Sequence, residues 1–250
     1  MPDTRVAIVT GAAGGLGAAV AGLLAESGHH LALVDSRREE LESTAKRLRV
    51  SGSTVKVLAT DLSDWSKCNR VVPEVVEQFG RVDILVNSAA ILLRQAMEEV
   101  TAADFDQVFY TNTRSVFLLS RAAISDMETR GWGRIVNVTS TGVYEGGFTM
   151  SSAMYESSKG AVAVLTKMFA KHGAPNGILV NTVCPGGMRT RMLLEQTSAD
   201  LVRRAEQELI PLRRLADPIE VAQMIAWLVS DRASYATGAE FDITGGIALH

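Results

Sequence analysis

The chain has 250 residues, of which 47% are hydrophobic and 21% charged, an ordinary globular composition. Its net charge of −3 and pI near 5.9 argue against a nucleic acid or an anionic membrane as the main partner. No apolar run reaches the ~18 residues that a membrane span needs, and the first expected strand leaves no room for a signal peptide. Cys68 and Cys184 lie far apart and in no metal-ligand spacing, so we expect idle or buried thiols, no metal site, and a reducing, cytoplasmic compartment.

Apolar runs of strand length alternate with segments of helical period along the chain. Strands are expected at residues 5–10, 30–35, 54–59, 82–86, 134–139, 178–183 and 240–243. Helices are expected at 15–27, 38–50, 64–79, 101–130, 153–172 and 217–230. Strands without polar alternation, separated by helices, indicate a parallel sheet covered on both faces. We predict one doubly wound, Rossmann-like α/β domain over residues 1–250, with seven parallel strands in the order 3-2-1-4-5-6-7.

One stretch, residues 186–211, lacks regular periodicity. Its length, position and Gly and Met content predict a flap that covers the substrate within the same domain.

The loop between the first strand and the first helix is rich in glycine. Gly11, Gly15 and Gly17 are spaced G-x-x-x-G-x-G, with Leu16 between the last two. Glycines let the backbone turn sharply and approach a pyrophosphate, and the helix N-terminus presents free N–H groups and a partial positive charge. The loop therefore predicts a dinucleotide site.

Asp35 ends the second strand, 18 residues after Gly17. An acidic residue there would hydrogen-bond the adenosine ribose hydroxyls and repel a 2′-phosphate, which predicts NAD as cofactor over NADP. Arg37 and Arg38 follow, and an arginine could instead cover a 2′-phosphate, or both could be solvated residues at a helix start.

Two further loops follow strands at the same edge of the expected sheet. Asp61 and Leu62 come after the third strand and are expected beside the adenine. Asn87 and Ala89 come after the fourth, where small residues would let the backbone run close to the cofactor. Asn87 could equally be a turn residue.

Tyr155 and Lys159 are four positions apart near the start of the helix at 153–172. Positions i and i+4 share one helix face, and an ammonium near a phenol lowers the phenol pKa, so the pair could transfer protons. Alone, the spacing also fits a packed tyrosine above a surface lysine. Among the four tyrosines, Tyr155 is the only one with lysine at i+4.

Taken together, these residues resemble the short-chain dehydrogenase/reductase family over essentially the whole chain. The motifs that carry the resemblance are T-G-x-x-x-G-x-G from Thr10 to Gly17, Asp61, Asn112, Ser140, Tyr155-x-x-x-Lys159, Pro185-Gly186 with Thr190, and the ending from Thr237 to Gly246. The resemblance implies hydride transfer between a nicotinamide, which Asp35 predicts to be that of NAD, and a secondary alcohol or ketone. It also implies a homotetramer that pairs the helices at 101–130 and 153–172 across one interface.

The resemblance also implies roles for individual residues. Tyr155 would be the acid/base, and Lys159 would stabilise the phenolate and hold the nicotinamide ribose. Ser140 would donate a hydrogen bond to the substrate oxygen, and Asn112 would support a water chain to Lys159. The residues expected to bracket the nicotinamide carboxamide are Pro185, Gly186 and Thr190. Those expected to line the substrate pocket, which we predict to suit a cyclic or moderately apolar alcohol or ketone, are Ser140, Tyr144, Met150, Met188 and Met192.

The chain departs from the family pattern in two loops. It has N-S-A-A at residues 87–90 where the family usually has N-N-A-G. Ser140 and Tyr155 are 15 positions apart, a longer spacing than this branch usually shows, so the extra residues must bulge outward if Ser140 is to keep its place. Otherwise Thr139 or Thr141 is the alternative hydroxyl.

Two competing functions remain open at this point. One is an NADP-dependent 3-ketoacyl reductase, which would favour basic residues over Asp35. The other is a non-catalytic dinucleotide-binding sensor, which would not need the tyrosine–lysine pair.

Overall fold

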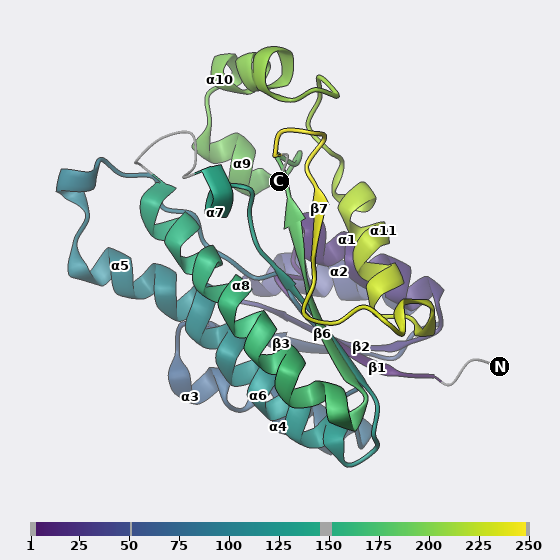
Figure 1. Cartoon of the computed structure of the whole chain (residues 1–250). Helices are drawn as coiled ribbons and strands as arrows, with labels where there is room; N and C mark the ends of the chain where they lie inside the picture. Colours follow the sequence, from purple (N-terminus) through teal and green to yellow (C-terminus); the bar gives the residue numbers. More distant parts are fainter. Residues whose placement is uncertain (1–3, 51, 146–151, 249–250) are drawn as a thin grey trace.

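A sheet of seven parallel strands runs through the centre of the molecule in the order β3-β2-β1-β4-β5-β6-β7. The computed structural model describes residues 4–50, 52–145 and 152–248 (Figure 1). The strands are β1 (Val6–Thr10), β2 (His30–Asp35), β3 (Val55–Ala59), β4 (Ile84–Asn87), β5 (Gly133–Val138), β6 (Ile178–Pro185) and β7 (Glu240–Ile243). The fold class and the strand order predicted from the sequence are confirmed.

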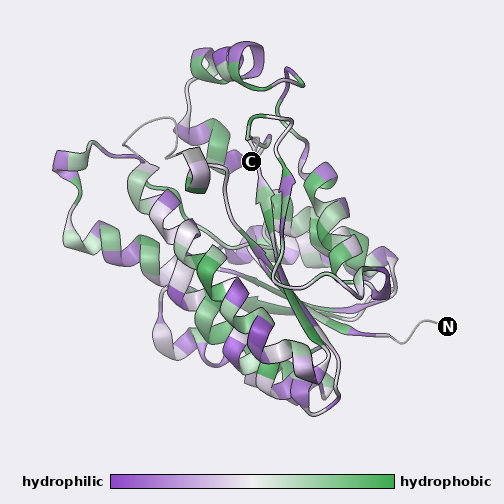
Figure 2. Cartoon of the chain, in the orientation of Figure 1, coloured by the Kyte–Doolittle hydropathy of each residue, from purple (hydrophilic) through white to green (hydrophobic). Residues whose placement is uncertain are grey.

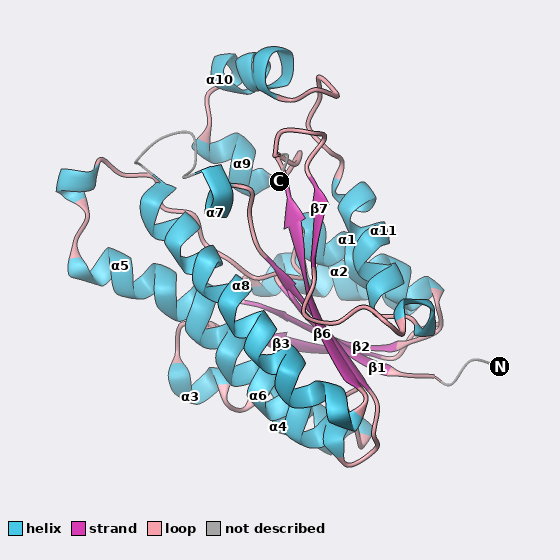
Figure 3. Cartoon of the chain, in the orientation of Figure 1, coloured by secondary structure: helices cyan, strands magenta, loops and turns pink. Residues whose placement is uncertain are grey.

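Helices cover both faces of the sheet (Figure 3). They are α1 (Gly15–Glu26), α2 (Arg38–Val50), α3 (Trp65–Cys68), α4 (Val71–Phe79), α5 (Ala102–Phe109), α6 (Ser115–Glu128), α7 (Gly142–Glu145), α8 (Ala153–Gly173), α9 (Arg191–Gln196), α10 (Ala199–Arg204) and α11 (Pro218–Leu228). Among the described residues, no helix combines the length and the apolar character that a bilayer-crossing segment needs.

Two apolar clusters, one on each face, hold these layers together. Alternate residues of β1 enter opposite clusters, because successive side chains of a strand point to opposite faces. Ala7 and Val9 pack with α1, α2 and α11, whereas Val6 and Ile8 pack with α4 and α6. The strands are correspondingly hydrophobic along their length, while the helices carry polar residues on their outer sides (Figure 2).

Two expected helices are each divided in the structure. The helix expected at 64–79 is interrupted between Cys68 and Val71, because Pro73 has no N–H and is tolerated only in the first turn of α4. The helix expected at 101–130 is interrupted by one π-helical turn, Tyr110–Arg114, between α5 and α6. The turn contains Asn112, and periodicity alone does not reveal such an insertion.

The stretch predicted to be irregular contains short helices. Residues 186–211 include α9, α10 and a π-helical turn at Ala205–Leu209. Thr190 and Ser198 cap α9 and α10 through their side chains. Figure 1 shows these helices beyond the end of the sheet where β6 and β7 finish.

Candidate active site

The glycine loop makes a tight turn from β1 into α1. A side chain on Gly17 would place its Cβ 2.3 Å from the Gly11 carbonyl oxygen, and one on Gly11 would place it 3.0 Å from the Ala89 Cα. No side chain caps the α1 N-terminus and its first turn holds no acidic residue, so amide groups there are left for an anion. The loop therefore fits the pyrophosphate of a dinucleotide. Leu16 is buried in the core, which leaves only its backbone for the predicted contact.

The Asp35 carboxylate lies against this loop. It accepts hydrogen bonds from the Ala13 amide at 3.1 Å and the Arg37 amide at 3.0 Å. The Arg37 guanidinium also reaches it, with Nε 3.3 Å from Oδ1, although this side chain is 40% exposed. Asp35 is thus placed at the carboxyl end of β2, beside the loop, where a ribose is predicted to bind.

The loops after β3 and β4 use their polar groups differently. The exposed Asp61 carboxylate accepts from the Ser63 amide at 2.9 Å and closes a turn, while Leu62 is buried in the core. The Asn87 side chain is also buried and donates to Asn137 at 2.8 Å. Contacts of these residues with a cofactor remain predictions.

Despite its altered sequence, the N-S-A-A loop meets the glycine loop. The amides of Ser88 and Ala89 both donate to the Thr10 hydroxyl at 3.0 Å. These bonds hold the loop after β4 against Gly11, where small residues are needed because the backbones nearly touch.

Tyr155 and Lys159 lie on the inner side of α8. Lys159 is 2% exposed; its Nζ donates to the Val138 carbonyl at 2.8 Å and lies 5.6 Å from the centre of the Tyr155 ring. Burial lowers the pKa of Lys159 to about 8.

The pKa of the Tyr155 phenol departs from its ordinary value in the direction opposite to the prediction. We expected the ammonium to lower its pKa, but burial, and secondarily the charges of Glu156 and Cys184, raise that pKa above its ordinary value. Burial is the largest cause because it disfavours the charged phenolate directly. The phenol is therefore neutral and able to donate a proton at neutral pH.

Asn112 ties three elements together from the π-helical turn. Its Oδ1 accepts from the Ile91 amide at 2.8 Å, and its Nδ2 donates to the Ile91 carbonyl and to the Ser158 hydroxyl, each at 3.0 Å. The side chain thereby links the loop after β4 to α8, one residue before Lys159. A role in a water chain remains a prediction.

Ser140 follows β5 and lies beside α8. Its Oγ accepts a hydrogen bond from the Gly142 amide at 3.3 Å and interacts with the Glu156 carboxyl group. The alternative hydroxyl of Thr139 is engaged elsewhere, 2.7 Å from a Glu240 carboxylate oxygen, and Thr141 is buried. Ser140 therefore remains the candidate for binding a substrate oxygen.

The sequence analysis missed Glu156. A carboxylate directly after the candidate Tyr155 was a visible signal, but nothing in the local sequence shows that it turns toward Ser140.

The three residues predicted to bracket the nicotinamide carboxamide lie at or just after the end of β6. Thr190 is close to the glycine loop, since its Cγ2 lies 3.3 Å from where a Cβ on Gly15 would be. The backbone at Gly186 lies against Thr244, so the chain leaving β6 and the chain leaving β7 meet there. Pro185 ends β6 and pairs with Ile243 in the sheet.

The predicted pocket-lining residues are only partly tested by geometry. The Tyr144 hydroxyl donates to the Glu240 carboxylate, and Met188 packs on the core cluster that contains α1 and α11. Met192 is half-buried on α9, and Met150 lies outside the described residues.

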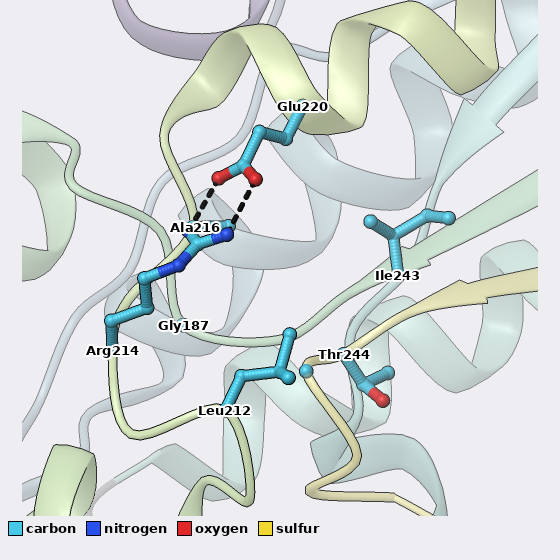
Figure 4. Close-up of a pocket in the computed structure, with 8 residues that line it drawn as sticks. Gly187, Leu212, Arg214, Ala216, Glu220, Ile243 and Thr244 are labelled. Atoms are coloured by element: carbon cyan, nitrogen blue, oxygen red, sulfur yellow. Dashed lines mark hydrogen bonds and ion pairs between the residues drawn. The ribbon is translucent and has the colours of Figure 1, made fainter.

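A separate small pocket lies where the chain returns to the sheet after the π-helical turn at Ala205–Leu209. Figure 4 shows Leu212, Ile243 and Thr244 around it, with Arg214 and Glu220 joined by two hydrogen bonds of 2.6 and 2.7 Å. This pair fastens the segment before α11 to the first turn of that helix. None of the predicted catalytic residues lines the pocket.

Comparison with known families matches nearly the whole chain. A family model described as enoyl-(acyl carrier protein) reductase covers residues 11–248. The chain is a short-chain dehydrogenase/reductase. It is therefore an oxidoreductase that uses a nicotinamide dinucleotide, as the sequence predicts.

Individual relatives of this short-chain dehydrogenase/reductase include named reductases. It is 34% identical to an acetoacetyl-CoA reductase of Allochromatium vinosum, over 98% of this chain and 99% of that protein. It is 36% identical to a monensin polyketide synthase putative ketoacyl reductase of Streptomyces virginiae, over 98% of this chain and 97% of the other. A crystal structure of a variant of actinorhodin polyketide ketoreductase with NADPH matches with a TM-score of 0.91 and 31% identity, over 100% and 99% of the two chains.

Proposed function

We propose that this short-chain dehydrogenase/reductase interconverts a ketone and a secondary alcohol, with Tyr155 as the acid/base. The observation that carries the proposal is the buried Lys159 ammonium, held 5.6 Å from the centre of the Tyr155 ring on the same face of α8. A lysine excluded from water is costly and is common at sites where its charge has a task. A non-catalytic sensor would not require this arrangement.

The chain's residues would divide the work of reduction among themselves. A nicotinamide held beside the glycine loop would supply the hydride that reduces the carbonyl carbon. Ser140 donates a hydrogen bond to the substrate oxygen and shares the charge that develops there. Tyr155, neutral before reaction, gives its proton to that oxygen, and the Lys159 ammonium stabilises the phenolate that remains. Oxidation runs through the same groups in reverse.

The experiment compares Tyr155→Phe with a control variant, Tyr235→Phe, because the Tyr235 side chain is fully exposed. Oxidation of NADH and NADPH is followed with acetoacetyl-CoA and a panel of cyclic and acyclic ketones. In the opposite direction, reduction of NAD and NADP is followed with the matching alcohols. We expect Tyr155→Phe to lower kcat by about 10²- to 10⁴-fold while dinucleotide affinity stays the same, since only proton transfer is removed. Unchanged turnover in Tyr155→Phe would exclude this role.

We propose NAD as the preferred cofactor. The support is Asp35, whose carboxylate lies beside the glycine loop and would accept a ribose hydroxyl but repel a 2′-phosphate. Arg37 favours NADP instead, because its half-exposed guanidinium could turn from Asp35 toward a 2′-phosphate.

The second candidate is NADP-dependent reduction of a 3-ketoacyl thioester. The names of two relatives and the NADPH in the structural neighbour favour it. The ratio of kcat/KM with NADH to that with NADPH decides between the two. Asp35→Ser should lower the ratio if NAD is preferred, whereas Arg37→Ala should raise it if Arg37 holds a phosphate.

We further propose that the protein assembles as a homotetramer in the cytoplasm. Large apolar side chains stand exposed on α5, α6 and α8, among them Phe105, Phe117, Val164 and Met168. Such an apolar surface on adjacent helices suits a helix-to-helix interface between copies. Light scattering that gives a monomer mass at micromolar concentration would exclude the assembly.

A further inference from the structure

Glu156 occupies a space that exists only because residue 142 is glycine. A Cβ on Gly142 would come within 2.1 Å of the Glu156 Cδ and 2.4 Å of both carboxylate oxygens. Gly142 is in α7, 14 positions before Glu156, so the end of this side chain is held against the turn that follows Ser140. Packing this close limits where the carboxyl group can point.

The groups that act on the Glu156 carboxyl come from three elements. They are the Ser140 hydroxyl after β5, the Lys159 ammonium one turn further along α8, and the Arg94 guanidinium in the loop after β4. Burial raises the pKa of Glu156, and the Ser140 hydroxyl, then the charges of Lys159 and Arg94, oppose the rise. Among the described residues, its Oε2 is buried without a hydrogen-bond partner, as is the Arg94 Nε.

Glu156 also acts on both members of the catalytic pair. Its charge raises the pKa of Tyr155 and that of Lys159. The charged or titratable groups around it are therefore Lys159, Arg94 and Tyr155, and a change in its protonation alters the field at all of them.

The Ser140 hydroxyl has one proton to donate and two lone pairs to receive bonds. The Gly142 amide already uses one lone pair. A neutral Glu156 can donate to the second, which leaves the proton of Ser140 for the substrate oxygen. An ionised Glu156 can only accept, so it takes that proton for itself.

We propose that Glu156 is a positioning residue whose protonation state sets whether the Ser140 hydroxyl donates to the substrate oxygen. This inference rests on the proposed function of Ser140. When Glu156 is neutral, Ser140 supports the oxygen of a ketone during reduction. When Glu156 is ionised, Ser140 turns its proton away, and reduction slows as pH rises through that ionisation.

The first test compares the pH dependence of kcat for acetoacetyl-CoA reduction in wild type, Glu156→Gln and Glu156→Ala. The amide of glutamine donates at every pH, so we expect the alkaline fall in Glu156→Gln to move up by about one pH unit or more. Glu156→Ala lacks both donor and acceptor and should lose about tenfold in kcat at acid pH. Glu42→Gln, an exposed position on α2, serves as the control. Superimposable profiles for wild type and Glu156→Gln would overturn the proposal.

The second test needs no turnover. Carboxyl-¹³C NMR of the cofactor-free protein follows the Glu156 titration, assigned by the signal lost in Glu156→Gln. Ser140→Ala removes a donor that favours the carboxylate, so the Glu156 midpoint should rise. An unchanged Glu156 midpoint in Ser140→Ala would refute the coupling between Glu156 and Ser140, even if wild type reduces no ketone. If the midpoint rises but wild type reduces no ketone, the coupling stands and the proposed function fails.

Discussion

Replacing Gly17 by alanine tests the closest backbone approach in the candidate cofactor site. The new Cβ would lie 2.3 Å from the Gly11 carbonyl oxygen and 2.6 Å from its carbon. That is about 1 Å short of an ordinary van der Waals contact, and backbone atoms on both sides must move to relieve it. Overpacking of this kind costs about 1–3 kcal/mol, which for a chain of this length lowers Tm by about 2–12 °C.

Gly22→Ala is the matched control in the same helix. Nothing lies within 4 Å of a Cβ at Gly22, so the alanine should stabilise α1 by about 0.5–1 kcal/mol through helix propensity alone. The two variants are compared by urea denaturation of the cofactor-free protein and by titration of NADH fluorescence. Displacement of the loop in Gly17→Ala should also weaken dinucleotide binding at least about tenfold. Equal stability and equal affinity in the two variants would refute the argument from close approach.

Two further predictions concern buried charges. Lys159→Met should raise the free energy of unfolding at pH 7 by about 1–3 kcal/mol while abolishing turnover, because it removes a buried charge whose pKa is lowered to about 8. This gain in the free energy of unfolding should shrink as pH rises from about 8 toward the ordinary pKa of lysine, because Lys159 of the folded wild type is then no longer charged. A gain that urea denaturation shows to be independent of pH would contradict this. Asp83→Ala should cost about 3–5 kcal/mol, because the fully buried carboxylate accepts from the Val6 amide at 2.9 Å and pairs with Arg81. Asp200→Ala on exposed α10 should stay within about 0.5 kcal/mol in the same assay, and an equal loss at both positions would refute the burial argument.

Much of the local geometry of the candidate cofactor site could be predicted from local sequence. The glycine spacing, the acid at the end of β2 and the i,i+4 spacing of Tyr155 and Lys159 are all set within one or two elements. Backbone geometry along a helix or across a tight turn depends on neighbours in the chain, so short spacing is informative there. The strand order also follows, since right-handed crossovers and the family resemblance leave few arrangements.

Other features could not be predicted, because they depend on what packs around a residue. The net rise in the pKa of Tyr155 results from burial, and the i,i+4 spacing that suggested a fall contains no information about solvent. The π-helical turn at Asn112 has no periodic signature, and its purpose is visible only in the bonds to Ile91 and Ser158.

The sequence alone therefore determined the α/β class, the dinucleotide loop and the identity of the tyrosine–lysine pair, because each depends on periodicity or on spacing within a few turns of chain. Only the tertiary structure decided which hydroxyl and which carboxylate stand beside that pair. Ser140 and Glu156 come together because β5 and α8 pack against each other and Gly142 leaves room between them. Burial and long-range contact, which set the charges of the site, exist only once the layers have assembled.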